Sequence, residues 1–190
     1  NSLVIDGVQD SPAFKKIWRT LGGEALPLAT DARNAMPGSV RALAVYADAF
    51  LYSSSSKGIV KQALTGVGKK YLAIANELYK YPEWDSAVGC AFLGGFYNVA
   101  PWPVGNKGKA AKFLREGARL APTRRNLYYA GVNAYQMGEF GDAADFFSRT
   151  LKAGPCKSPS STEADFADFI LAEAKRGLKL SEEALAGGGA

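Results

Sequence analysis

Hydrophobic residues recur along this chain at the three- and four-residue spacing that is typical of amphipathic helices. In the stretch 139–153, for example, Ala143, Phe147 and Leu151 fall on one helical face. No run of β-branched residues alternates with polar ones over a length that would form a sheet. The pattern therefore predicts an all-α fold. The expected helices span 12–21, 24–35, 39–53, 59–80, 84–99, 106–120, 124–137, 139–153 and 162–178.

Two of these helices, 124–137 and 139–153, carry small and aromatic residues at spacings that suit a tightly packed helical hairpin. The residues concerned are Leu127, Ala130, Gly131, Ala134, Ala143, Phe147 and Pro155. A small residue at Gly131 lets the second helix approach closely, and Phe147, one turn after Ala143, fills the space beside it. Pro155 ends the second helix, because proline cannot continue the helical hydrogen-bond pattern.

An earlier part of the chain repeats this pattern with a longer turn. Leu93–Gly94 fits the first-helix position, and Ala110-x3-Leu114 precedes Pro122 as the matching motif precedes Pro155. Four extra residues lie in the turn, which holds Trp102 between two prolines. The helix-ending prolines at 37, 82, 122 and 155 lie 45, 40 and 33 residues apart, so the repeat drifts toward the N-terminus.

These spacings resemble the tetratricopeptide repeat (TPR), a helix-turn-helix unit. The resemblance implies a TPR-like α-solenoid of about four antiparallel helix pairs plus a C-terminal capping helix. A single domain is expected over 1–180, with the clearest repeats at 91–122 and 124–155 and the capping helix at 162–178. Ser160 with Glu163 three residues later indicates a capping box at the start of that helix. Residues 181–190 are expected to be a flexible tail.

In TPR proteins the first helices of successive repeats line a groove that takes a peptide or a partner helix. The resemblance therefore implies groove positions in this chain, and they are Asn98, Arg125, Tyr128, Val132, Tyr135 and Gln136. Tyrosine and arginine are common at interface hot spots. The alternative for Tyr128 and Tyr135 is that they pack between helices or lie under the C-terminal helix. The Lys and Asn pattern of chaperone-tail-binding TPR domains is absent from these positions.

The chain is basic over residues 1–138, with 17 Lys and Arg against 9 Asp and Glu, and acidic after that. Candidates for a basic binding face or anchor are Trp102, Lys107, Lys109, Lys112 and Arg124. The basic residues could be an ordinary solvated helix face, bind an acidic protein, or touch RNA or an anionic membrane. Nucleic acid is disfavoured, because the lysines are not interleaved with aromatics. Trp102 is either a plug on the core or an exposed anchor.

Catalysis is disfavoured by the complete absence of histidine, which removes the commonest general base and metal ligand. Cys90 and Cys156 are 66 residues apart and form no zinc pattern. Cys90 is expected in the core, and a disulfide between the two is not supported. We expect no enzyme activity, no metal and no cofactor. The uncharged stretch 86–106 contains Pro101 and Pro103, which argues for a buried helix and against a membrane span.

Two classes of function remain. The first is a protein-binding scaffold, assembly factor or accessory subunit, whose partner belongs to a large complex that could be membrane-embedded. The stretch Arg41 to Leu64 is similar to TPR-like proteins of plants and green algae, and the turn Pro101 to Gly105 resembles one in organellar and bacterial TPR-like proteins. That resemblance implies a chloroplast stroma location near photosynthetic complexes, and it would account for a first residue other than Met. The alternative is a small-ligand-binding TPR helper subunit of a bacterial solute transporter, located in the periplasm, with a pore lined by Tyr128 and Tyr135.

Overall fold

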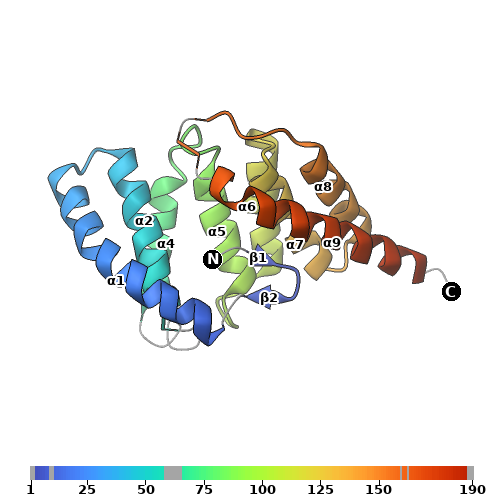
Figure 1. Ribbon diagram of the computed structural model, residues 1–190, viewed down its shortest axis with the longest axis horizontal. Helices are drawn as coiled ribbons and strands as arrows, with labels where there is room; N and C mark the ends of the chain where they lie inside the picture. Colours follow the sequence, from blue (N-terminus) through green and yellow to red (C-terminus); the bar gives the residue numbers. More distant parts are fainter. Residues whose placement is uncertain (1–2, 9–10, 58–65, 159, 162, 188–190) are drawn as a thin grey trace.

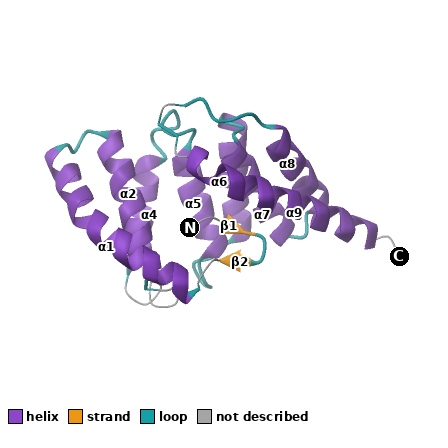
Figure 2. Ribbon diagram, viewed as in Figure 1, coloured by secondary structure: helices purple, strands orange, loops and turns teal. Residues whose placement is uncertain are grey.

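The computed structural model describes residues 3–8, 11–57, 66–158, 160–161 and 163–187 (Figure 1). The regular secondary structure of the described residues is helical apart from one antiparallel pair of two-residue strands, which confirms the all-α class (Figure 2). The helices are α1 Pro12–Ala35, α2 Val40–Ser55, α4 Val67–Leu78, α5 Val88–Val99, α6 Lys107–Leu120, α7 Arg124–Gln136, α8 Phe140–Lys152, the 3-10 turn η1 Glu163–Phe166 and α9 Ala167–Gly187. The strands are β1 Leu3–Val4 and β2 Gly7–Val8.

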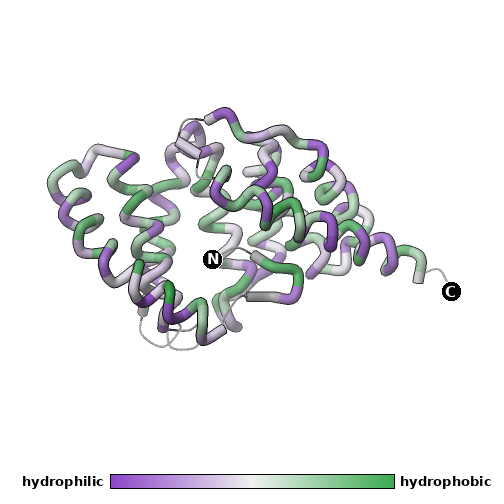
Figure 3. The backbone as a smooth tube through the Cα atoms, viewed as in Figure 1, coloured by the Kyte–Doolittle hydropathy of each residue, from purple (hydrophilic) through white to green (hydrophobic). Residues whose placement is uncertain are grey.

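Each helix packs mainly on the next one along the chain, from α1 on α2 through to α8 on α9. Two further contacts, α5 on α7 and α7 on α9, join helices that are not consecutive. Figure 1 shows α9 lying across α7 and α8, after a segment that returns over the helix ends toward the start of α5. The N-terminal strand β1 lies against α7. The hydrophobic and hydrophilic residues interleave along the helices (Figure 3), as amphipathic helices require.

Polar residues define where several helices begin. The side chains of Ser11, Ser39, Asn106 and Thr123 each accept a hydrogen bond from the backbone N–H three residues later. Such N-caps satisfy one of the donors that the first helical turn leaves without a partner. These four caps place the starts of α1, α2, α6 and α7, and all four starts lie within one residue of the expected boundaries.

The hairpin of α7 and α8 is packed as the sequence predicts. A Cβ atom added at Gly131 would lie 2.8 Å from the ring of Phe147, so only glycine allows this approach. Gly94 meets Leu114 in the same manner in the earlier pair, α5 and α6. Phe147 and Ala143 are fully buried. Gly94 and Gly131 therefore act as close-packing positions in these two helix pairs.

The first expected pair of helices, 12–21 and 24–35, is a single helix, α1. Gly22 was expected to lie between them, but it packs directly on the backbone of α2 at Ser53, where a side chain would collide. Gly22 therefore allows α1 to pack closely on α2, and it does not end a helix. Pro27 lies within α1. This merging means that the N-terminal part does not divide into the helix pairs that the repeat pattern predicted.

Three other boundaries differ from the expectation. The expected tail 181–190 is helical to Gly187, because Ser181 is buried and donates a hydrogen bond to the carbonyl of Gly177. The serines after residue 52, expected in a loop, extend α2 to Ser55. The first part of the expected helix 59–80 lies largely outside the described residues, and α4 begins at Val67.

Candidate functional site

The predicted groove on α7 is occupied by the protein itself. Tyr128 and Val132 have no exposed surface, because α9 packs across α7. The ring of Tyr128 meets Phe169 of α9 edge-on, with ring centroids 6.4 Å apart. The expectation of an open groove at these two residues is therefore corrected, and they belong to the core. Tyr135 is half-buried and packs edge-on against Phe140 of α8.

Asn98 and Gln136 hold the N-terminal strands in place. The Gln136 amide donates to the backbone carbonyls of Val4 and Ile5, at 3.1 and 3.2 Å. Asn98 in turn donates to the side-chain oxygen of Gln136 at 3.0 Å. The polar groups that a groove would offer to a peptide are thus bound to the chain's own N-terminal segment.

Arg125 is a buried structural residue and not a groove residue. Its guanidinium lies 3.0 Å from the Asp85 carboxylate and also donates to the backbone carbonyls of Asp85 and Ser86. Its backbone N–H donates to the buried Glu163 carboxylate at 3.0 Å. Arg125 therefore joins α7 to the turn before α5 and to the segment that leads into α9.

The turn before α5 has an unusual backbone. Asp85, Ser86 and Ala87 have φ angles of 40°, 52° and 60°, values that side chains other than glycine seldom adopt. The side-chain amide of Asn126 donates a hydrogen bond to the Ser86 carbonyl at 2.7 Å. The Ser160 hydroxyl accepts one from the backbone N–H of Asp85 at 2.9 Å. None of the three residues is a glycine, so the local sequence carries no signal for this turn. The hydrophobic pattern therefore predicted a helix from residue 84, whereas α5 begins at Val88.

The expected capping box of Ser160 and Glu163 is not formed. The Ser160 hydroxyl bonds to Asp85, and the Glu163 carboxylate bonds to Arg125, so both side chains serve long-range contacts. The backbone N–H of Glu163 donates a hydrogen bond to the side-chain hydroxyl of Ser161. Long-range burial of Glu163 has therefore replaced the local pairing that the spacing suggested.

Trp102 is the most exposed large hydrophobic side chain among the described residues, with 90% of its surface accessible. The loop that carries it is closed by backbone hydrogen bonds from Val104 and Gly105 to the carbonyl of Pro101, both 3.0 Å. Another bond, 2.8 Å long, runs from Asn106 to Tyr97. Val104 is 47% exposed beside it. The Trp102 side chain is therefore exposed and does not plug the core.

The basic candidates divide into two groups. Lys107, Lys109 and Lys112 are exposed on α6 just after the Trp102 loop. Lys109 donates to the Tyr97 hydroxyl at 2.8 Å and lies 4.1 Å from the centre of that ring, so its position is fixed. Arg124, in contrast, is half-buried and donates to the carbonyl of Ala153 at 2.9 Å. Trp102 with the three lysines is called the Trp102 surface below.

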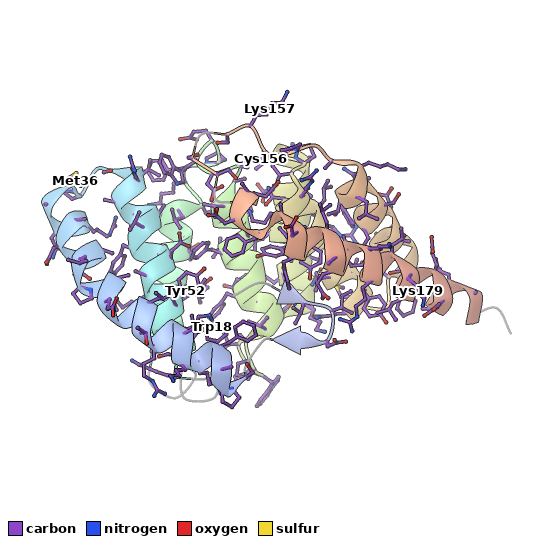
Figure 4. The ribbon with its side chains drawn as sticks, viewed as in Figure 1. Trp18, Met36, Tyr52, Cys156, Lys157 and Lys179 are labelled. Atoms are coloured by element: carbon purple, nitrogen blue, oxygen red, sulfur yellow. The ribbon has the colours of Figure 1, made fainter. Side chains whose placement is uncertain are left out.

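The two cysteines are free thiols in different surroundings. Cys90 is buried as expected, and this burial, followed by the charge of Glu116, raises the pKa of its thiol to about 12. Cys156, labelled in Figure 4, lies in the segment before η1. Its burial raises the pKa, but hydrogen bonds with Ser161, Ser86 and the backbone of Ser158 outweigh that effect and leave it below the ordinary value.

Within the part of the chain that the structure describes, no three His, Cys, Asp or Glu side chains are grouped to hold a metal ion. No helix in that part has both the length and the apolar character to cross a membrane. Comparison of the chain with protein-family models, with curated proteins and with solved structures found no match.

Proposed function

We propose that this chain is a TPR-like helical-repeat protein that acts without catalysis, as a scaffold, assembly factor or accessory subunit. In this proposal it docks on a larger protein complex through the Trp102 surface. The observation that carries the proposal is the 90% exposure of Trp102 on a loop closed by its own hydrogen bonds. A large exposed aromatic ring on a loop closed by backbone hydrogen bonds is the kind of side chain that interface hot spots favour, because tryptophan offers a large contact area with only two side-chain torsions to restrict.

The chemistry of the surface indicates the kind of partner. Burial of a tryptophan side chain is worth about 5 kcal/mol before the costs of association. Lys107, Lys109 and Lys112 follow the loop in the sequence and add exposed positive charge on α6. Such an arrangement favours an acidic protein surface with an apolar pocket, and it speeds association in a salt-dependent way.

The cellular setting belongs to the same proposal. The stretch from Arg41 to Leu64 resembles TPR-like proteins of plants and green algae. This resemblance supports a location in the chloroplast stroma, beside a photosynthetic complex. The alternative of a ligand-binding transporter helper requires Tyr128 to line a pore. Tyr128 is packed against Phe147 and Phe169, so the scaffold is the better-supported function.

The test is co-purification from a plant or algal stromal extract, with mass spectrometry of the bound proteins. Wild-type protein is compared with Trp102→Ala and with Leu28→Ala, which removes an equally apolar side chain that is 72% exposed on α1. The proposal predicts one complex retained by wild type and Leu28→Ala and lost by Trp102→Ala. Equal retention by all three proteins contradicts it.

A further inference from the structure

The N-terminal arm, which we define as residues 3–8, is seated on the helices in the manner of a bound peptide. Its strands β1 and β2 pair antiparallel with Val4 opposite Gly7, so Ile5 and Asp6 form the tip of a tight hairpin. Strand β1 lies against α7 (Figure 1). A two-stranded hairpin is at best marginally stable on its own in water. The contacts that its tip makes with the helices therefore hold the arm in place.

The Ile5 side chain anchors the arm between α8 and α9. It is 5% exposed and belongs to the hydrophobic core that contains Phe147 and Ile170. A Cβ atom added at Gly177 of α9 would lie 2.8 Å from Cδ1 of Ile5 and 2.6 Å from the ring of Phe147. Glycine at this position therefore leaves the room that both side chains need. The helices present a fitted apolar position to one aliphatic side chain.

A chain of three side-chain amides binds the backbone of the arm. Gln136 donates to the carbonyls of Val4 and Ile5, at 3.1 and 3.2 Å. The Gln136 oxygen accepts from Asn98 at 3.0 Å, and the Asn98 oxygen accepts from Asn133 at 2.8 Å. These bonds fix the Gln136 amide with its N–H groups toward the arm. Because they reach main-chain carbonyls, they suit any segment that adopts the same backbone conformation.

The residue after Ile5 adds a charged contact. The Asp6 carboxylate lies 2.6 Å from the guanidinium of Arg176 on α9, and the two side chains are 68% and 44% exposed. Ion pairs as exposed as this one contribute little to stability, whereas charges at the rim of an interface select the partner and speed its association. Arg176 therefore favours an acidic residue at this place without fastening the arm strongly.

We propose that Gln136, Gly177 and Arg176 form a peptide-binding site, called the arm site, which the N-terminal arm occupies as an internal competitor. The partner that fits it is a protein segment in a tight turn, with an aliphatic residue directly followed by aspartate. Such a segment repeats the apolar, backbone and charged contacts of the arm. A short tether gives the arm an effective concentration on the order of millimolar, so the partner binds weakly until the arm is released. The proposal does not rest on docking through the Trp102 surface.

The experiment follows the fluorescence polarisation of a fluorescein-labelled peptide that has the sequence of residues 3–8. Ile5→Ser in the protein removes the apolar anchor of the arm. It should tighten peptide binding by about tenfold or more, the factor that corresponds to burying one isoleucine side chain. Asp6→Ala removes only the exposed ion pair and should tighten binding by about two- to fivefold. Because Asp6→Ala leaves the core intact, it gives the same test without a risk to folding.

Two controls locate the bound peptide. Arg176→Gln, made in the Asp6→Ala protein, should abolish the preference for this peptide over its Asp6→Asn form. Arg149→Gln should keep that preference, since Arg149 is similarly exposed on α8 but lies in a different ion pair, with Asp145. The proposal is overturned if wild type binds the peptide as tightly as both arm variants do, or if no protein binds it in a saturable way. Equal binding of a peptide that carries Ile5→Ser overturns it as well.

Discussion

The guanidinium of Arg125 lies 3.0 Å from the carboxylate of Asp85, and the two side chains are 8% and 7% exposed. Their sequence separation is 40 residues, so this ion pair joins α7 to the turn before α5. The backbone of Arg125 also holds Glu163, which starts the path into α9. The pair therefore links the middle of the chain to the helix that covers the predicted groove.

Removing Arg125 is expected to destabilise the fold strongly. Arg125→Ala leaves the buried Asp85 charge without its partner, which costs about 3–5 kcal/mol in the free energy of unfolding. Urea denaturation measures this directly. Arg149→Ala is the control, because its exposed pair with Asp145 is worth about 0.5 kcal/mol or less. Similar losses in the two variants would contradict the clamping role of Arg125.

Two glycine substitutions test the packing of α7 on α8. Gly131→Ala places a methyl group against Phe147 and is expected to cost about 1–3 kcal/mol through overpacking. Gly141→Ala, in the exposed first turn of α8, meets no atom within 4 Å and should stabilise by up to about 1 kcal/mol. Thermal unfolding of both variants compares them. If both raised the melting temperature, the close approach at Gly131 would be refuted.

Asp48 should make the stability of the protein depend on pH. Its folded-state pKa of about 6 lies above the ordinary 3.8, so its contribution is fully present below 3.8 and is lost as the pH rises through 6. Asp48→Asn is therefore expected to match wild type near pH 4 and to exceed it by up to about 3 kcal/mol at pH 7.5. Urea unfolding at both pH values provides the measurement. A difference that does not change with pH would argue against a raised pKa.

The two thiols should differ in reactivity. At pH 8 Cys156 is expected to react with iodoacetamide at least about a hundredfold faster than Cys90, because the thiolate is the reactive form and burial disfavours it at Cys90. Peptide mass spectrometry of timed samples gives both rates. Cys156→Ser should leave only the slow reaction, and comparable rates at the two sites in wild type would show that Cys90 is accessible.

Local packing was predictable from the sequence. Gly131, Ala143 and Phe147 are close together along two adjacent helices, so their spacing alone defines how those helices meet. The break expected near Gly22 was wrong, because the low helix propensity of glycine is overridden when its missing side chain lets α1 approach α2. Gly22 and Gly131 therefore both serve the close packing of two helices, although the sequence alone suggested a break at the first.

The long-range contacts were not predictable. Arg125 was placed in a groove by its position in the repeat, and nothing near it in sequence indicated a partner at Asp85. The left-handed turn that presents Asp85 contains no glycine, which is the usual signal for positive φ. The exposure of Trp102 was left open for a related reason, since the prolines beside it restrict the loop without deciding which way the ring points.

The most direct test of the docking proposal is site-specific cross-linking. A photoreactive p-benzoylphenylalanine is placed at position 102 in one protein and at position 28, another highly exposed apolar site, in a second. After illumination in stromal extract, the account predicts one dominant cross-linked protein from position 102, suppressed by high salt, and none from position 28. A partner captured from position 28 and not from position 102 would contradict it.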